Sequence, residues 1–414
     1  MNKVFVIMIF LGLLLAIDWY VYQGATLALK NASTLTQSIV RYSYWGITII
    51  TFSIILIYNF GNPYWMQGTS RNMIFTGIFI NYFSKLFSVV LLLSGDLVRA
   101  GQWIVSLFQN PEPSNIGQTI PRSEFLAKVA MASAAIPFGA FTYGIISGAH
   151  DYRVKRLTVN LPNLPKSFDG IRIGQISDIH TGSFFNKTAV NGGVEMMLGE
   201  KPDLIFFTGD LVNNKASEVS EYFDVFKKLR APYGVYSVTG NHDYGDYHSW
   251  ESATAKSRNF EDLIRAHKEL GFDLLMNENR ILEQGGDKLA IIGNENWGAG
   301  RFSKYGKLDL AYRGTEDAAT KLLLSHDPSH WDAQVRKEFP DIDLMFAGHT
   351  HGFQFGVEIG GFKWSPSQYI YKQWAGLYSE NNQHLYVNRG FGFLGYPGRV
   401  GIPPELTVIQ LKRA

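Results

Sequence analysis

The stretch Thr239-Gly240-Asn241-His242-Asp243 directly follows the apolar run from Val235 to Val238, and we therefore expect it at the tip of a strand. Alone it would be weak evidence, because Gly-Asn is common in turns. However, an apolar run that ends abruptly in Asp, Asn or His occurs five times after residue 170; the other four end in Asp178-Ile179-His180, Gly209-Asp210, His326 and Gly348-His349-Thr350-His351. In open α/β folds, ligands bind beyond the carboxyl ends of the strands, so these ends predict one shared polar site.

Charged residues divide the chain into two regions. Residues 1–149 carry only twelve Asp, Glu, Lys or Arg residues, whereas the remaining 265 residues carry sixty-two. This contrast predicts an apolar region over 1–150 and an ordinary soluble domain over 151–414. Neither region has a long basic run, so no nucleic acid is indicated as a partner. The absence of cysteine excludes disulfides, thiolate metal sites and cysteine nucleophiles.

The first region contains apolar segments long enough to cross a bilayer as helices. No small-residue cleavage pattern follows the first segment, which favours a retained helix over a cleaved signal peptide. The lipid bilayer is therefore an expected partner, and we predict an integral, multi-pass membrane protein with about four spans: Val4–Tyr22, Tyr44–Tyr58 with a start near Ile39, Met73–Leu93 and Phe125–Gly148. Lys85 and Asp96 fall in or beside the third span and are expected at the membrane interface.

The orientation in the membrane is poorly determined, since the basic residues divide equally between the two sides. The cluster Arg153, Lys155 and Arg156 directly after the last span slightly favours a cytoplasmic second domain. Against this, residues 121–126 resemble an incomplete twin-arginine export motif. Residues 111–115, which contain two prolines, are expected to form a loop between the third and fourth spans.

After residue 150 the pattern predicts strands that alternate with helices, which is typical of a layered α/β domain. Residues 157–161 read as an edge strand, and helices are expected at 187–199, 217–229 and 260–270. Residues 244–259 are polar and aromatic without clear periodicity, so we expect a loop over the site.

Taken in order, the five motifs resemble those of the calcineurin-like metallophosphoesterases over about residues 155–414. The runs 201–204, 232–236 and 403–406 are similar to the bacterial membrane-associated branch of that superfamily. Phe353 departs from the branch, which usually has a second glycine at this place. The resemblance implies an α/β layered sandwich of two mixed β-sheets flanked by helices. The predicted fold is therefore a multi-pass α-helical membrane region followed by this calcineurin-like domain.

The resemblance also implies a site for two divalent metal ions, for which Mn, Fe and Zn remain open. Such a pair, roughly 3.5 to 4 Å apart, neutralises an anionic phosphoester and activates water. Asp210 would bridge both ions, and the implied ligands are Asp178, His180 and His351 on the first ion and Asn241, His326 and His349 on the second.

Two further residues have implied or possible contacts with substrate. His242 would act as general acid or charge stabiliser at the leaving oxygen, and Asp243 could fix its ring. Arg399, in a glycine-rich loop, could bind a phosphate oxygen or could stabilise that loop.

The predicted function is a membrane-anchored two-metal phosphoesterase that cleaves a phosphodiester or pyrophosphate bond, with a lipid-linked or envelope compound as a plausible substrate. A membrane-held phosphomonoesterase is the alternative within this chemistry. A catalytically inactive metal-binding scaffold is the alternative outside it, although a scaffold has no need for His242.

Overall fold

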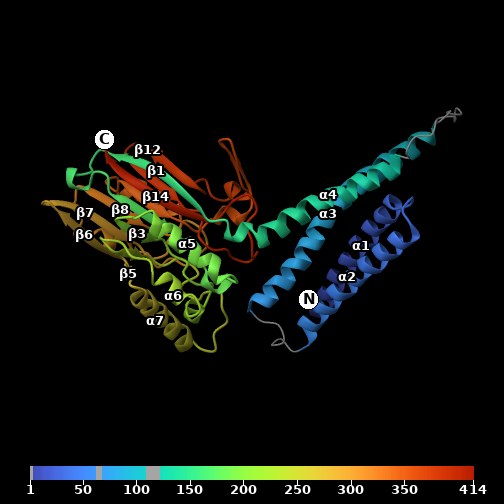
Figure 1. The fold of residues 1–414 in the computed structure, drawn as a ribbon, viewed down its shortest axis with the longest axis horizontal. Coiled ribbons are helices and arrows are strands. Elements are labelled where there is room, and N and C mark those ends of the chain that lie inside the picture. Colours follow the sequence, from blue (N-terminus) through green and yellow to red (C-terminus); the bar gives the residue numbers. More distant parts are fainter. Residues whose placement is uncertain (1–2, 62–67, 109–121) are drawn as a thin grey trace. The chain divides into compact units, whose positions relative to one another are not determined.

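The computed structural model describes residues 3–61, 68–108 and 122–414, and the chain divides into two compact units, Met1–Tyr143 and Gly144–Ala414 (Figure 1). The expected loop at 111–115 lies outside the described residues, as does Pro121 of the export-like motif. The first unit, here the helical unit, is built from the long helices α1 (Lys3–Ala28), α2 (Thr34–Phe60), α3 (Gly68–Ser106) and most of α4 (Arg122–Ile146).

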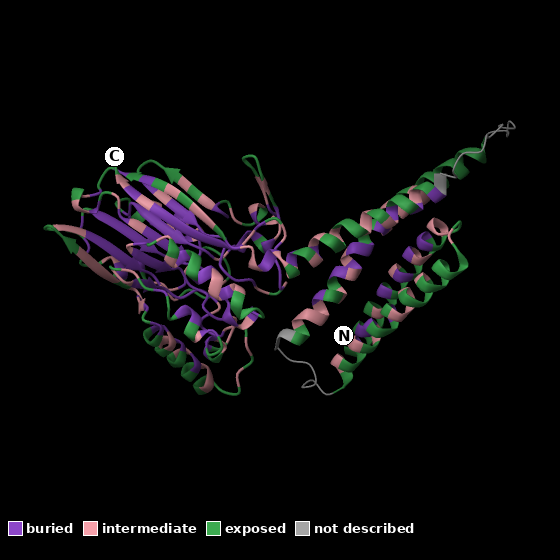
Figure 2. Cartoon of the chain, viewed as in Figure 1, coloured by how far each residue is buried: buried purple, intermediate pink, exposed green. Residues whose placement is uncertain are grey.

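All four helices are long and apolar enough to cross a membrane, so the predicted multi-pass region is confirmed. α1, α2 and α3 extend beyond their predicted spans at both ends, and α2 begins at Thr34, before the expected Ile39. α4 begins three residues before its predicted span and ends at Ile146, two residues before the predicted Gly148. Most of the residues in these spans are not buried (Figure 2), which suits helices whose outer face meets lipid rather than water.

Lys85, for which an interfacial position was expected, has a buried charged partner inside the helical unit. Lys85 is 8% exposed, and its Nζ lies 2.5 Å from Oδ1 of Asp18, which is fully buried. The hydroxyl groups of Thr48 and Tyr82 donate to Oδ2 of Asp18 at 2.8 and 2.7 Å. Asp18 therefore joins α1, α2 and α3, and a charge that is costly in lipid is paired inside the helical unit.

The second unit, which the sequence predicts to be catalytic and which is called the catalytic unit below, contains two six-stranded mixed sheets and one separate hairpin (Figure 1). The first sheet has the order β1-β14-β2-β3-β4-β5 and the second β12-β13-β9-β8-β7-β6, and β10 pairs with β11. The strands are β1 (Arg153–Leu161), β2 (Arg172–Ile176), β3 (Leu204–Phe207), β4 (Val235–Ser237), β5 (Asp273–Leu274), β6 (Glu278–Gln284), β7 (Asp287–Gly293), β8 (Thr320–Leu324), β9 (Leu344–Ala347), β10 (Val357–Ile359), β11 (Phe362–Trp364), β12 (Gly376–Glu380), β13 (Gln383–Val387) and β14 (Glu405–Arg413).

The two sheets pack face to face, and helices cover their outer faces. Apolar side chains of both sheets, such as Phe206 and Phe346, form one buried cluster between them. Further clusters join the outer face of the first sheet to α5 (Lys187–Gly199), α6 (Phe223–Phe226) and α7 (Ala253–Leu270), and that of the second to α8 (Leu308–Tyr312) and the turns before α9 (Arg336–Glu338). The predicted layered sandwich is confirmed, and its buried sheets are visible in Figure 2.

Two local predictions in this unit are wrong. The helix expected at 217–229 is only a 3₁₀ turn, Ala216–Val219, followed by the short α6. The loop expected at 244–259 ends early, because Ser252 caps α7 by accepting a hydrogen bond from the N–H of Ala255. The first turns of α7 are mostly exposed, so they carry no apolar periodicity. By contrast, α5 has the predicted bounds, and β1 is the predicted edge strand.

Candidate metal centre

The predicted site residues follow the carboxyl ends of β2, β3, β4, β8 and β9. Several of them have positive φ angles: Asp178 and His180 at 51°, Asp210 at 59°, His349 at 72° and His351 at 50°. This backbone conformation is unfavourable for residues other than glycine and clusters at functional sites. The turns redirect side chains from the two sheets toward one place.

Asp178, His180 and His351 form the first group of potential metal ligands, with their ligand atoms within 4.8 Å of one another. Nε2 of His180 lies 3.1 Å from Nε2 of His351, and the latter lies 3.3 Å from Oδ1 of Asp178. The carboxylate of Asp178 also accepts the backbone N–H of His349 at 2.9 and 3.1 Å. Asp178 thus ties the end of β2 to the end of β9.

Asp210, His326 and His349 form the second group. Oδ2 of Asp210 lies 3.2 Å from Nε2 of His326 and 3.5 Å from Nε2 of His180, which belongs to the first group. Nδ1 of His326 donates to the carbonyl of Thr208 at 2.7 Å, which leaves Nε2 free to face the site. One carboxylate oxygen is therefore placed between the two groups, as a bridging ligand requires.

Asn241 provides a direct test of whether these residues fit a cation. Its Nδ2 donates to the hydroxyl of Tyr247 at 2.9 Å, while its buried Oδ1 has no hydrogen-bond partner in the structure. A buried carbonyl oxygen without a partner is costly, and a cation would satisfy it. Together with buried imidazoles and carboxylates, this donor set fits Mn, Fe or Zn.

His242 lies in the wall of the same pocket, beside the two groups. Its Nδ1 donates to the carbonyl of Asn213 at 2.8 Å, so Nε2 is the nitrogen left for chemistry. The expectation that Asp243 fixes this ring is wrong. The Asp243 carboxylate instead accepts the backbone N–H groups of Gly240, Asp210 and Leu211 at 2.8 to 2.9 Å, and so holds the ends of β3 and β4 together.

Arg399 is 1% exposed and does not line the pocket. Its Nη2 donates to the carbonyl oxygens of Arg389 and Gly392 at 2.8 and 2.5 Å, and lies 3.2 Å from Nδ1 of His351. The predicted contact with a phosphate oxygen does not fit this placement, because the guanidinium already donates its hydrogen bonds to backbone carbonyl oxygens. The alternative, an arginine that stabilises the loop, agrees with these contacts. The contact with Nδ1 also helps to position the ring of His351.

Burial and mutual charge shift the titration of the cluster. Burial raises the pKa of Asp178 to about 6 and lowers the pKa of His180 to about 3. Burial also opposes protonation of His326, yet the charge of Asp210 outweighs it and raises the pKa of His326 to about 10. The Asp210 carboxylate therefore favours positive charge beside it, which is the electrostatic condition for a cation site.

The pocket that opens over these residues has a volume of about 430 Å³. Besides the candidate ligands, it is lined mostly by aromatic and aliphatic side chains, namely Phe302, Phe353, Tyr371, Leu394 and Tyr396. Two residues near the centre were not among the predicted site residues. The hydroxyl of Tyr371 lies 2.8 Å from Nε2 of His349, and the hydroxyl of Tyr247 accepts a hydrogen bond from Asn241. Tyr247 does come from the stretch expected to cover the site.

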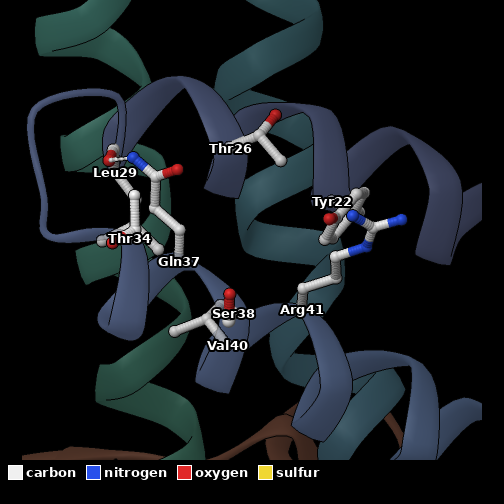
Figure 3. Close-up of a pocket in the computed structure, with 8 residues that line it drawn as sticks. All are labelled: Tyr22, Thr26, Leu29, Thr34, Gln37, Ser38, Val40 and Arg41. Carbon is white, nitrogen blue, oxygen red and sulfur yellow. Dashed lines mark hydrogen bonds between the residues drawn. The ribbon is translucent and has the colours of Figure 1, made fainter.

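A separate cavity of about 230 Å³ lies between α1 and α2 in the helical unit (Figure 3). Its lining includes Tyr22, Gln37 and Arg41, and Gln37 donates to the carbonyl of Leu29 at 3.1 Å. The described residues that line it include no His, Asp or Glu, so it offers no comparable metal site.

Comparison with known proteins agrees with both units. Residues 2–149 match the family model described as a probable calcineurin-like phosphoesterase, transmembrane domain, and residues 171–353 match the model of the calcineurin-like phosphoesterases. The uncharacterized metallophosphoesterase YkuE of Bacillus subtilis is 30% identical over 70% of this chain and 97% of its own length.

Two other relatives have more informative names. A transmembrane protein with metallophosphoesterase domain from Danio rerio is 26% identical over 85% of this chain and 75% of its own length. The UDP-2,3-diacylglucosamine pyrophosphatase LpxG of Chlamydia trachomatis is 27% identical over 62% of this chain and 88% of its own length. With its two matched regions and its buried Asp and His cluster, this chain belongs to the calcineurin-like metallophosphoesterases and is a membrane-linked hydrolase of phosphoester bonds.

Proposed function

We propose that the protein cleaves a phosphodiester or pyrophosphate bond in a lipid-linked or envelope substrate, with two divalent ions of Mn, Fe or Zn. The observation that carries this proposal is the pair of ligand groups around Asp210, which faces a pocket with a largely apolar wall. A phosphoester group would lie over the ligands, while the aromatic wall would contact the rest of the substrate.

In this proposal Asp178, His180 and His351 would hold one ion, Asn241, His326 and His349 would hold the other, and Asp210 would contact both. When bound, such an ion pair neutralises the phosphoester charge and activates water. The chain itself supplies fixed geometry: a hydrogen bond to the carbonyl of Thr208 orients His326, and a hydrogen bond with the hydroxyl of Tyr371 orients His349.

His242 is assigned the leaving oxygen. Because Nδ1 is bonded to the carbonyl of Asn213, Nε2 can carry a proton toward the pocket and deliver it to the departing group. The ring of His242 packs against the rings of His180 and Tyr247, at 5.1 and 4.5 Å between centroids, and its backbone N–H donates to Oδ1 of Asp210 at 2.9 Å. It is therefore positioned beside the metal ligands without belonging to either group.

Three observations favour a substrate that carries acyl chains. The chain has helices able to span a membrane, and tethering raises the local concentration of lipid substrates around the site. The pocket wall is rich in aromatic side chains. In addition, the Chlamydia relative is named for a pyrophosphatase that acts on a diacylated nucleotide sugar.

The test is hydrolysis by the metal-reconstituted full-length protein in mixed micelles. We expect UDP-2,3-diacylglucosamine or a related nucleotide lipid to be cleaved at least ten times faster than UDP-glucose, which has the same pyrophosphate but no acyl chains. Bis(4-nitrophenyl) phosphate should likewise be preferred to 4-nitrophenyl phosphate. A preference for the monoester would favour the phosphomonoesterase alternative, and no turnover of any ester with both ions bound would favour the scaffold.

We further propose that the catalytic unit faces the cytoplasm. Support comes from Arg153, Lys155 and Arg156, which follow the last candidate span within a few residues.

A further inference from the structure

Two hairpins of the catalytic unit have the same Gly-Gly turn, but polar residues flank one turn and apolar residues flank the other. The turn between β6 and β7 is Gly285-Gly286, with φ angles of 59° and 87°, and that between β10 and β11 is Gly360-Gly361, with φ angles of 55° and 88°. Paired positive φ angles are typical of tight two-residue hairpins. Gln284 and Asp287 flank the first turn, whereas Ile359 and Phe362 flank the second. The turn geometry therefore does not require apolar flanks.

The β10–β11 hairpin exposes these apolar side chains. Ile359 is 73% exposed and Phe362 is 62% exposed. They are cross-strand partners, as are Val357 and Trp364, so the four side chains share one face of the hairpin. We call Val357, Ile359, Phe362 and Trp364 the hairpin face. Its tip is among the most exposed apolar surface of the catalytic unit, an arrangement that soluble surfaces rarely keep without a partner.

The opposite side of the hairpin is polar and fixed to the body of the unit. Glu358 pairs with Lys155 at 3.2 Å and with Arg389 at 3.3 Å. Nζ of Lys363 donates to the carbonyl of Ala375 at 2.5 Å. These contacts hold the polar side inward, so the hairpin face is directed outward.

The base of this hairpin is linked to residues 144–148, which belong to the catalytic unit and to the C-terminal end of the last candidate membrane span. The N–H of Gly356 donates to the carbonyl of Val400 at 2.9 Å, and the N–H of Arg399 donates to the carbonyl of Gly144 at 3.1 Å. Gly144 belongs both to the catalytic unit and to the span Glu124–His150. A β-carbon at Gly148 would overlap with the carbonyl oxygen of Arg399, so the two segments are in close contact. The loop at Arg399 and Val400 thus contacts both the C-terminal end of the span and the base of the hairpin.

We propose that the hairpin face enters the interfacial layer of the lipid bilayer and forms a second membrane contact of the catalytic unit. The partner is the lipid surface, because the same loop that holds the hairpin also holds the end of a membrane span. Trp and Tyr favour this layer, and Nε1 of Trp364 lies 3.4 Å from the hydroxyl of Tyr369, which is itself 76% exposed. The contact does not depend on the substrate proposed above.

A membrane contact of the hairpin would also determine where the mouth of the metal-site pocket lies. Phe353 lies two residues before Phe355, whose ring is 6.3 Å from that of Trp364, and Phe353 lines the pocket while being 43% exposed. The hairpin would therefore hold the mouth of the pocket next to the lipid surface, where a lipid phosphoester could enter without crossing water.

The absence of cysteine allows a direct test with the full-length protein. Ile359→Cys is labelled with an environment-sensitive dye and reconstituted into nanodiscs that hold one copy each, and Gln284→Cys on the matched polar hairpin is the control. At position 359 we expect blue-shifted emission and at least threefold stronger quenching by lipids with a nitroxide near the headgroup than at position 284.

Equal, weak quenching at the two positions would overturn the proposal. Strong quenching at both would overturn it too, because the dye itself would then drive the contact. A blue shift at 359 that appears only when two copies share a disc would assign the hairpin face to a second copy of the chain and would also overturn it. None of these readouts uses turnover, so they are independent of the proposed substrate.

Discussion

At the scale of single residues, the candidate centre contains side chains with two polar atoms, one of which already makes a hydrogen bond within the protein. His326 uses Nδ1 for the carbonyl of Thr208, His242 uses Nδ1 for Asn213, and Asn241 uses Nδ2 for Tyr247. Each residue is left with one atom that faces the site. Fixed orientation of this kind reduces the entropy lost when a ligand binds, and it explains how turns at the ends of strands can build a rigid centre.

Asp210 is the residue whose change should affect both ions. We expect Asp210→Asn to retain less than half of the bound metal after dialysis and to lose at least a hundredfold in kcat, because an amide cannot supply the shared negative charge. Elemental analysis measures the metal content. His384→Gln, a change near the edge of the second sheet, is the control and should alter neither quantity. Full metal occupancy in Asp210→Asn would remove Asp210 from the bridging role.

His242 separates an enzyme from a scaffold. His242→Ala should keep both ions but lose roughly a hundredfold or more in kcat, the usual scale for general acid catalysis. The loss should be smaller for 4-nitrophenyl esters, because nitrophenolate leaves without a proton. Kinetics with a series of leaving groups measures this dependence. An unchanged rate on every ester, with metals bound, would exclude His242 from the mechanism.

His267 should make the catalytic unit less stable in acid. It is fully buried, Nδ1 lies 3.0 Å from Oγ of Ser237, and burial lowers the pKa of His267 to about 3. An unfolded histidine has a pKa of about 6.5, so between these values the unfolded chain binds the additional proton. The contribution of His267 to the free energy of unfolding is therefore fully present above pH 6.5 and decreases as the pH falls, by about 2 kcal/mol from pH 7.5 to pH 5.

The matched variant is His267→Gln, which keeps a polar partner for Ser237 but does not titrate. In metal-free protein, its thermal midpoint should fall less between pH 7.5 and pH 5 than that of the unchanged protein. The same fall in both proteins would show that His267 is not a source of the acid sensitivity.

At the scale of helices and strands, local patterns predicted some features well and others poorly. The strand ends that carry Asp178, Asp210 and His349 were predictable because an apolar run followed by a polar turn is a local signal. The start of α7 was not, because its first turns are mostly exposed and have no apolar stripe. The contacts of Asp243 and Arg399 were also not predictable, since they depend on backbone groups that only the folded chain brings near.

Asp18 and Lys85 show the same limit in the helical unit. They are 67 residues apart in sequence, so neither helix alone reveals that its charge is paired. In the sequence, Asp18 is an isolated charge in an apolar run, and Lys85 was expected at the membrane interface. The fold instead pairs them and adds hydroxyl donors from Thr48 and Tyr82.

This pairing predicts how the helical unit responds to mutation. Asp18→Asn should destabilise it by roughly 3 to 5 kcal/mol, because Lys85 would remain buried without a counter-charge. The double variant Asp18→Asn/Lys85→Met should recover most of that loss. Thermal unfolding in detergent, followed by circular dichroism, measures both, and Asp96→Asn at an exposed ion pair is the control. A double variant no more stable than Asp18→Asn would contradict the ion-pair explanation.

At the scale of the whole molecule, the two units are built for different surroundings. The helical unit exposes apolar side chains such as Leu13, Ile49 and Val90, whereas the catalytic unit buries its own apolar clusters around two sheets. The charge contrast between residues 1–149 and the rest of the chain already predicted this division. Composition indicates whether a unit is surrounded by lipid or by water, but it does not determine on which side of a membrane the second unit lies.

The side of the membrane can be decided with single cysteines, because the chain has none of its own. An even number of spans places the connection between α1 and α2 on the opposite side from the catalytic unit, and the basic cluster at 153–156 favours the cytoplasm for the latter. In intact cells, a membrane-impermeant maleimide should therefore label Ala32→Cys strongly. Glu283→Cys, in the exposed part of β6, should be labelled only after permeabilisation. The reverse pattern would place the catalytic unit outside the cytoplasm, and equal labelling of both positions in intact cells would contradict an even number of spans.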